Sequence, residues 1–534
     1  MWFRFSASVL VTMVVGSLLL ASCSNASPVA TPEMSSTSKP YGSLVIGSGA
    51  ITQSAIDPAL ATPATFQEMA AAIFDSLTEM SPQGQIIPGI AERWEIATNG
   101  MSQTFYIRKG VKFHNGDDLT GADVKFSIER MMSPIATHSD AAVWRSFIAS
   151  VALKDDFTVV INMKAPVFEL LKGFTDFGGS PAVVPKKYLE EKGNDYFGTH
   201  PVGSGPYKYV GGVAGASIEL EAMDSHWKGV PKFKNITVLK VPNEASKVAM
   251  LKTGELDAAM ISPDSAADLQ KAGLRILKHE GGSQYFAIFY YDIEHPKDAA
   301  MGDVKVRKAM SLAVNRKEII DYVYKGYGEP SVLFYGGRSA DFWDSNLLKP
   351  DPYDPEGAKK LLTEAGYPNG FTTKLWDKDP GGINTTLNTS LVGYWSKIGV
   401  KTEIVPIEFA AFTPKYRPKM TPEIFNSLTG SISSAGPFGF EKMVQVHHSK
   451  KGVYQNHANA RLDELIDKVP TMLDGPEKKK AQLEATVLAR DDYHSIAVLD
   501  IYTIYALGPK VGDVTIVKNL QSFADKFYAV SHPK

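Results

Sequence analysis

Two groups of side chains in this 534-residue sequence have types and spacings that could support chemistry. His447 and His448 are adjacent and His457 follows them, a set of imidazoles that would suit a metal ion. Glu255 and Asp257 lie two residues apart, which on a strand places both carboxylates on one face, as an acid and base pair requires. Adjacent histidines point in different directions, however, and no Cys or His-Glu-x-x-His pattern accompanies them. We therefore predict no metal site, and we interpret the acidic pair as part of a solvated turn.

A glycine-containing segment at residues 201–207, Pro-Val-Gly-Ser-Gly-Pro-Tyr, could cradle a phosphate if a helix followed it. The residues after it have a strand pattern instead, so the segment is predicted to be a sharp turn. The sequence contains no Gly-x-Ser-x-Gly elbow, Walker motif or dinucleotide fingerprint, and no nucleophile with an obvious base. We therefore predict no enzymatic activity and no cofactor.

The length and composition limit the class of protein. A chain of this length is too long for a single core, so two to four domains are expected. The net charge is only −2, which lacks the basic footprint of a nucleic-acid-binding protein, and no nucleic acid partner is expected. Cys23 is the only cysteine, so no internal disulfide can form.

The N-terminus explains that cysteine. Arg4 precedes an apolar run at residues 9–21, which ends in Leu-Ala-Ser-Cys, with Cys23 last. This pattern predicts a lipoprotein signal peptide over residues 1–22, with cleavage before Cys23 and acylation of that residue. As a helix the run would span roughly 20 Å, too short for about 30 Å of hydrocarbon, which disfavours a transmembrane helix. Residues 23–40, rich in Ser, Thr, Pro and Ala, are predicted to be a flexible tether.

The expected location follows from this signal. The mature protein is predicted to be exported and held at the membrane through the lipidated Cys23, in a periplasm or at a cell surface. The alternative of a plain secreted protein with an unmodified cysteine remains open.

Local signals then define the elements that must position any site. Asn-Gly at residues 99–100 lies between two strand-like runs and predicts a hairpin, and Asn-Gly at 115–116 predicts a second turn. Thr120 with Asp123 predicts a capping box at the start of a helix. The buried face of this helix is predicted to contain Val124, Ile128, Met131 and Met132.

Further helix starts are marked by side chains that cap the first turn. Asp303 is predicted to cap a helix, and Asn315 with Glu318 is predicted to start the next one. Asp354 followed by Pro355 predicts another helix start.

Two strand–helix–strand successions predict parallel sheets. They cover residues 236–241, 244–252 and 259–261, and residues 372–376, 384–398 and 400–406. Residues 284–291 have an aromatic, strand-like pattern. Residues 495–505 form a long apolar run, typical of a strand buried on both faces.

Several of these segments together resemble the family 5 solute-binding proteins of ABC importers, which include oligopeptide, dipeptide and nickel-chelate binders. The resemblance extends over nearly all of the predicted mature chain. It is carried by residues 88–94, 108–116, 119–124, 201–207, 251–258 and 303–315.

This resemblance implies an α/β fold of the periplasmic-binding-protein type II class. Two hinged lobes with mixed sheets are expected, plus an extra α/β subdomain in the first lobe. The implied division is a signal peptide at 1–22, a tether at 23–40, lobe I at 41–78, the extra subdomain at 79–200, lobe I again at 201–283, lobe II at 284–504, and a return to lobe I at 505–534.

The resemblance also implies a ligand held between the lobes. The first-lobe loop at residues 48–58 is expected to line this site. The candidate ligand-binding residues are Ser54, Tyr285, Trp376, Thr429, Ser431, Ser433 and Phe438.

One stretch departs from the peptide-binding relatives. Those relatives carry an aspartate that pairs with the α-amino group of the peptide, but residues 425–438 here contain no acidic side chain. An amine buried at this place would lack its counter-ion, which is costly. A neutral or anionic ligand, or a peptide held in another way, is therefore favoured.

The resulting functional prediction is a receptor that delivers a small solute, nominally a peptide, to the permease membrane subunits of an ABC importer. A monomer is expected. Two alternatives remain open: an exported hydrolase on the same scaffold, and a ligand sensor for a membrane signalling protein.

Overall fold

The computed structural model describes residues 39–49, 51, 55–60, 70–81, 85–138, 141–168, 173–175, 182–334, 343–378, 380, 383–416, 420–434, 440, 443, 446–452, 458–473, 475–514 and 531–533. All of them belong to one compact unit, residues 33–534. The predicted signal peptide, Cys23 and nearly all of the predicted tether lie outside these residues. None of the described helices is both long and apolar enough to cross a membrane.

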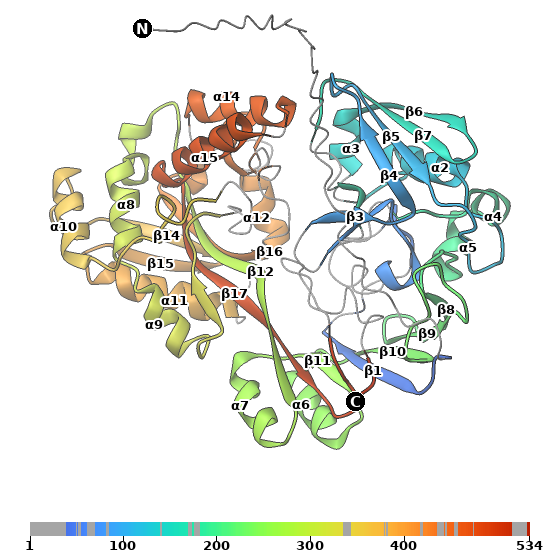
Figure 1. Ribbon diagram of the computed structural model, residues 1–534. Coiled ribbons are helices and arrows are strands. Elements are labelled where there is room, and N and C mark those ends of the chain that lie inside the picture. Colours follow the sequence, from blue (N-terminus) through green and yellow to red (C-terminus); the bar gives the residue numbers. More distant parts are fainter. Residues whose placement is uncertain are drawn as a thin grey trace, which may run out of the picture. The chain divides into compact units, whose positions relative to one another are not determined.

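Eleven strands form the main sheet, and β12 and β17 are its longest members (Figure 1). The order is β15-β14-β16-β12-β17-β11-β1-β10-β9-β8, and β13 also pairs with β17. The strands are β1 (Ser43–Ser48), β8 (Tyr207–Gly211), β9 (Ser217–Ala222), β10 (Asn235–Lys240), β11 (Ala258–Met260), β12 (Arg275–Tyr290), β13 (Gly328–Pro330), β14 (Thr372–Asp377), β15 (Lys401–Pro406), β16 (Ser427–Ser434) and β17 (Ser495–Leu507).

The two long strands connect two separate hydrophobic cores. Residues 275–279 of β12 pair with residues 503–507 of β17, and residues 283–288 of β12 pair with residues 495–501, with a register shift between the two stretches. The first stretch lies beside β11, and the second lies beside β16. We call the region of the register shift the crossing, the part on the β11 side the first lobe, and the part on the β16 side the second lobe.

The first lobe contains β1 and β8–β11, whose apolar side chains form one core with the segment at residues 70–74. A smaller core lies under α6 (Glu244–Thr253) and α7 (Pro263–Lys271). β1 is parallel to both β10 and β11 and lies between them, as the predicted strand–helix–strand succession requires.

A separate four-stranded sheet has the order β4-β5-β7-β6. Its strands are β4 (Ala91–Ile96), β5 (Ser102–Ile107), β6 (Ile148–Asp155) and β7 (Thr158–Met163). The predicted hairpin is confirmed, because β4 and β5 are antiparallel and Gly100 adopts a φ of +66° in the turn between them. The predicted capping box is also confirmed: Thr120 and Asp123 satisfy each other's backbone N–H groups at the start of α2 (Gly121–Met132). Val124, Ile128 and Met131 are buried, and Met132 is partly buried.

The second lobe carries helices against one face of its strands (Figure 1). The three predicted caps are confirmed. Asp303 accepts from Lys305 N at 2.8 Å, Asn315 accepts from Glu318 N at 3.1 Å, and Asp354 accepts from Gly357 N at 2.8 Å. The capped helices are α8 (Val304–Leu312), α9 (Arg316–Tyr322) and α10 (Pro355–Glu364), and α11 (Ile383–Ser396) joins them in this core.

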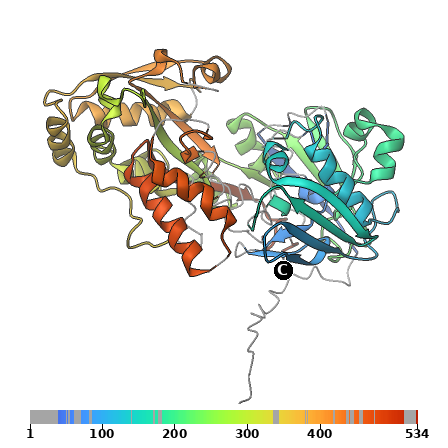
Figure 2. The same cartoon turned by 90° about the horizontal axis from the view of Figure 1, so that it is seen from above.

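Two further helices, α14 (Ala460–Lys468) and α15 (Pro476–Asp491), pack against each other over a small core of their own (Figure 2). The remaining elements are short. They are β2 (Thr78–Met80), β3 (Ile86–Pro88), α3 (Ala141–Phe147), α4 (Lys186–Lys192), α5 (Asn194–Thr199) and α12 (Phe409–Tyr416), with short 3-10 turns at Pro296–Asp298, Ala300–Gly302, Pro422–Ile424 and Val469–Thr471.

The interpretation of Asp257 as part of a solvated turn is wrong. Its side chain is only 2% exposed, and one carboxylate oxygen accepts from Val45 N at 2.8 Å. The other oxygen lies 3.0 Å from the Lys510 ammonium. Asp257 therefore ties β1 to the segment after β17, whereas Glu255 is exposed as predicted. Sequence spacing could not reveal this, because both partners are remote in the chain.

Candidate functional site

Two sets of parallel strands, one in each lobe, have their carboxyl ends toward the crossing. In the first lobe β1 is parallel to β10 and β11, and the last residue of β11, Met260, pairs with Tyr505 of β17. In the second lobe β14 is parallel to β15 and β16, and the last residue of β16, Ser434, pairs with Ser283 of β12. Both pairs lie on the side of their lobe that leads into the register shift.

Ligands of open α/β sheets bind beyond the carboxyl ends of parallel strands, and ligand sites are common where domains meet. The carboxyl ends of both sets and the crossing between them therefore form the candidate ligand site. Of the loop predicted to line it from the first lobe, residues 48–58, only parts are described, and Ser54 lies outside them.

Lysines lie at the carboxyl ends of one strand in each lobe. Lys240 is the last residue of β10 and is exposed, and its ammonium has no hydrogen bond or ion pair with a described residue. Lys378 directly follows β14 and is half-buried. Its ammonium lies 5.8 Å from the ring centre of Phe409 and 5.9 Å from that of Phe412, within reach of cation–π attraction. The candidate site thus has positive charge on both sides.

Three of the predicted ligand-binding residues lie on one face of the second-lobe sheet. Trp376 of β14 pairs with Thr429 of β16, and Ser431 pairs with Phe286 of β12. The Thr429 hydroxyl donates to the Trp376 carbonyl at 2.9 Å, and the indole of Trp376 donates to the Ser427 hydroxyl at 2.9 Å. These bonds fix Trp376 and Thr429 within the sheet, so the half-buried Ser431 is the more accessible of the three.

Tyr285 is not brought together with these residues. It lies on the opposite face of the sheet, in the core under α8 and α11, and it is fully buried. Its hydroxyl donates to the Asn388 side-chain oxygen at 2.6 Å, and burial raises its pKa well above the ordinary value. Both groups pack over Gly430, where an added Cβ would lie 1.9 Å from the Asn388 oxygen. The surroundings of Tyr285 are those of a core residue.

The other predicted site residues are Ser54, Ser433 and Phe438. Phe438 lies outside the described residues, as Ser54 does. Ser433 is described through its backbone only, which pairs with Gln284 of β12 close to the crossing.

Sequence reasoning missed Lys240 and Lys378. Lys240 is the second-last residue of the predicted strand at 236–241, and Lys378 lies two residues beyond the predicted strand at 372–376. Their nearness to strand ends was the available signal. Sequence reasoning also missed a buried polar network beside the crossing. There Gln284 donates to Asp500 at 2.6 Å and to Ser331 at 3.1 Å, and Ser331 donates to the same Asp500 oxygen at 2.7 Å. Its partners are far apart in sequence, so spacing gives no signal.

The adjacent histidines make separate contacts. His447 is buried, with one ring nitrogen 2.7 Å from His494 and the other 2.8 Å from the Phe334 carbonyl. His448 lies instead against the Asp463 carboxylate at 3.4 Å. The two rings therefore belong to different polar contacts. His457 lies outside the described residues.

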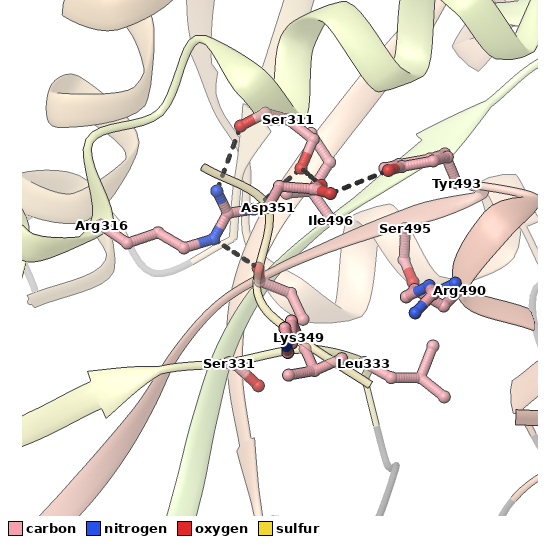
Figure 3. A pocket seen from close by; sticks show the side chains of 12 residues that line it. Ser311, Arg316, Ser331, Leu333, Lys349, Asp351, Arg490, Tyr493, Ser495 and Ile496 are labelled. Carbon is pink, nitrogen blue, oxygen red and sulfur yellow. Dashed lines mark hydrogen bonds between the residues drawn. The ribbon is translucent and has the colours of Figure 1, made fainter. Parts of the chain in front are cut away.

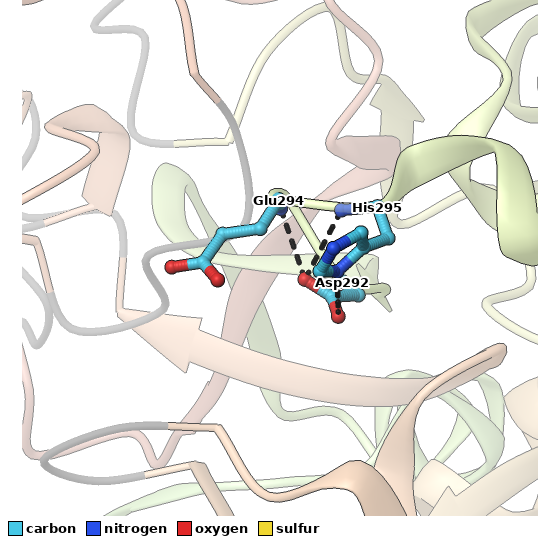
Figure 4. A group of neighbouring side chains, drawn as sticks. All are labelled: Asp292, Glu294 and His295. Carbon is cyan, nitrogen blue, oxygen red and sulfur yellow. Dashed lines mark hydrogen bonds and ion pairs between the residues drawn. The ribbon is translucent and has the colours of Figure 1, made fainter.

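One other group of described residues has the composition of a metal site. Asp292, Glu294 and His295 lie together in the exposed loop after β12 (Figure 4). The Asp292 carboxylate already accepts from the backbone N–H of Glu294 at 2.9 Å and contacts the His295 ring at 3.1 Å. These are local contacts of a turn, which explain the arrangement without a metal ion.

Comparison with known proteins places this geometry in a family. The sequence model of the bacterial extracellular solute-binding proteins, family 5 Middle, matches residues 85–449. Heme-binding protein A of Haemophilus influenzae is 27% identical over 542 residues, which cover 94% of this chain and 95% of the relative. The glutathione-binding protein GsiB of Pectobacterium atrosepticum is 29% identical over 361 residues, 67% of this chain and 68% of the relative.

A solved structure has the same fold. The ABC transporter-associated periplasmic binding protein DppA from Helicobacter pylori, in complex with the peptide STSA, matches with a TM-score of 0.74 and 23% identity. The match covers 93% of this chain and 99% of that protein. The predicted periplasmic-binding-protein type II fold is thereby confirmed. The chain belongs to family 5 of the bacterial extracellular solute-binding proteins, the solute receptors of ABC importers.

Proposed function

We propose that this receptor binds a small anionic, peptide-like solute at the crossing and delivers it unchanged to the permease of its importer. The observation that supports this proposal is the pair of lysines, Lys240 and Lys378, at the carboxyl ends of the two sets of parallel strands. A carboxylate between the lobes would meet positive charge from both sides, and bonds between charged groups are the stronger hydrogen bonds.

The second support is the composition of β16. Its sequence, Ser-Leu-Thr-Gly-Ser-Ile-Ser-Ser, contains no acid that could pair with a buried ammonium group. The Asp377 carboxylate at the end of β14 instead accepts from Thr385 of α11 at 2.6 Å. The names of two relatives fit an anionic solute, since heme and glutathione both carry carboxylates.

Capture would use the two lobes as a hinge about the crossing. A ligand that contacts both lobes only in the closed form selects that form, because its extra contacts stabilise it. A micromolar affinity would correspond to about 8 kcal/mol of net binding free energy. The division into lobes I and II at residues 283 and 504, with an extra subdomain at 79–200, is part of this proposal.

The same proposal covers the place of the protein in the cell. The pattern before Cys23 supports cleavage at residue 22 and a lipid anchor, with residues 23–40 as the tether. We propose that the protein works as a monomer held at the outer side of the membrane, without catalytic turnover of its solute.

The test is calorimetric titration of purified residues 24–534, the predicted mature chain without its lipidated Cys23. The ligands are reduced glutathione, triglycine, whose side chains carry no charge, and the cationic trilysine. Glutathione is expected to bind and trilysine is not. Lys378→Ala is expected to weaken glutathione binding by about 10- to 100-fold, the value of a hydrogen bond to a charged group. Lys374→Ala is the matched control, because Lys374 is exposed on the same strand but lies away from its carboxyl end.

Equal binding of glutathione by the wild-type protein and Lys378→Ala, or preferred binding of trilysine, would contradict the anionic ligand. Mass spectrometry of the released solute separates a receptor from a hydrolase, because a receptor returns glutathione intact. Loss of uptake in a deletion strain with intact signalling would argue against a sensor.

A further inference from the structure

A small polar pocket in the second lobe has most of its lining away from the candidate ligand site. It shares Ser331 with the polar network beside the crossing. It opens at the amino end of β17, whereas the ligand site lies at the crossing and at the carboxyl ends of β14 and β16. Its lining contains Ser311, Arg316, Ser331, Lys349, Asp351, Arg490, Tyr493 and Ser495, and Figure 3 shows these side chains.

Arg316 is the most deeply placed charge in this pocket. Its guanidinium is buried and donates to the Ala497 carbonyl at 3.2 Å, the Ser311 carbonyl at 3.1 Å and the Ser311 hydroxyl at 2.8 Å. These bonds use three of the five N–H donors that a guanidinium carries. Burial lowers the pKa of Arg316, and the charge of Asp351 acts against this effect. Two donors of a buried cation thus have no acceptor among the described residues.

Two more donors of the lining are also unused. Ser495 is only 7% exposed, and its hydroxyl has no hydrogen-bond partner among the described residues. The Lys349 ammonium has no hydrogen bond or ion pair with a described residue. A buried hydroxyl without a partner is destabilising, so an occupant that accepts a hydrogen bond from it would be stabilising.

The charges of the lining are unbalanced. Arg490 is already paired with Asp491 at 2.7 Å. Among the other charges of the lining, the cations Arg316 and Lys349 face the single acid Asp351, a formal excess of one positive charge. The Asp351 carboxylate is already occupied, because it accepts from the Ser311 hydroxyl at 2.5 Å and from the Tyr493 hydroxyl at 2.9 Å. It therefore fixes the wall of the pocket and leaves the other donors for an occupant.

We propose that this pocket is a binding site for a small oxyanion, such as sulfate, phosphate or a single carboxylate, held by Arg316, Ser495 and Lys349. This anion site is distinct from the site of the transported solute. The proposal of an anion site does not depend on the function proposed above. A bound anion would contact three segments at once: the start of α9, the loop before α10 and the start of β17. Its role would be to stabilise the second lobe, since a ligand that binds only the folded chain raises its stability.

The main rival occupant is ordered water, which could accept the same bonds. The test is thermal unfolding of the full mature protein in increasing sodium sulfate, with sodium chloride adjusted to keep the ionic strength constant. We expect the Tm to rise and saturate. Ser495→Ala and Lys349→Ala are expected to raise the half-saturating sulfate concentration about tenfold or more. Lys374→Ala, which removes an exposed lysine elsewhere in the same lobe, should leave it unchanged.

A rise that does not saturate and is equal in all four proteins would be the general effect of sulfate on protein surfaces and would overturn the proposal. No rise at all would overturn it as well. Crystals grown with sodium selenate supply a second measurement, in which an anomalous selenium peak between Arg316 and Ser495 is expected. Density for water alone at this position would contradict an anion site.

Discussion

At the scale of single residues, charges buried in the first lobe are strongly paired. Arg130 of α2 donates to both carboxylate oxygens of Asp57, at 2.7 and 2.5 Å, and to the Asn194 side chain at 2.8 Å. Asp57 is 0% exposed and Arg130 is 7% exposed. Such a pair contributes little compared with an apolar contact of equal size, but removal of one partner leaves the other charged and buried.

Arg130→Ala is therefore expected to lower the free energy of unfolding by about 3–5 kcal/mol. Lys112→Ala is the matched control, because it breaks a pair of similar length, 2.7 Å to Asp118, whose side chains are more than half exposed. Lys112→Ala should lower the free energy of unfolding by less than about 1 kcal/mol. Urea unfolding followed by circular dichroism measures both changes. An equally small decrease in the free energy of unfolding in both variants would contradict this prediction. It would mean that other groups stabilise the buried Asp57 carboxylate.

At the scale of elements, the turn at residues 201–207 is defined by its contact with another backbone. A Cβ added to Gly203 would lie 2.0 Å from the Ile73 carbonyl oxygen, so no side chain fits there. The segment is also held through the buried Asp75, which accepts from the Ser204 hydroxyl at 3.0 Å and from the Trp227 indole at 2.9 Å. Burial acts to raise the pKa of Asp75, but Lys228 and His226 outweigh it and hold the pKa well below the ordinary range.

Gly203→Ala is expected to destabilise the protein by about 3 kcal/mol or more, since the neighbouring backbone must move. Gly393 of α11 offers the opposite case, because a Cβ there meets nothing within 4 Å and the position is exposed. Gly393→Ala should stabilise the protein by about 0.5–1 kcal/mol through the better helix propensity of alanine. Thermal unfolding of both variants tests the contrast. Equal effects would mean that the contact with Ile73 is not tight.

At the scale of the whole molecule, the two lobes share their longest strands. β17 contributes buried apolar side chains to cores on both sides of the crossing. β12 contributes buried side chains to the second-lobe core and the partly buried Ile276 and Leu277 to the first-lobe cores. The Gln284–Ser331–Asp500 network lies beside the crossing. Strands that continue through two cores couple their unfolding, because melting one core removes the ladder partners of the other.

We expect the main sheet to unfold in one cooperative calorimetric transition. The second lobe should be followed through Trp395, which is buried in its core, and the first lobe through amide exchange of β1 and β10. Both probes should report the same midpoint. Two resolved midpoints would show that the crossing transmits little stability between the lobes.

Local structure in this protein was predictable because its causes are local. The Asn-Gly hairpin, the Thr120 capping box and the caps at Asp303, Asn315 and Asp354 depend only on neighbouring residues, and all of them are confirmed. The family was also identified from sequence, because its motifs lie in these same segments.

Long-range arrangement was decided by the tertiary structure. The strand-like patterns of residues 284–291 and 372–376 predict that Tyr285 and Trp376 lie on strands, but strand pairing decides that they occupy opposite faces of one sheet. In the same way Asp257 is buried by Val45 and Lys510, and Arg316 meets Ser495 in one pocket, although these partners are remote in the chain. The sequence by itself determined which helices and strands form and to which family the chain belongs. Which side chains share a site depended on registers and crossings that no local spacing encodes.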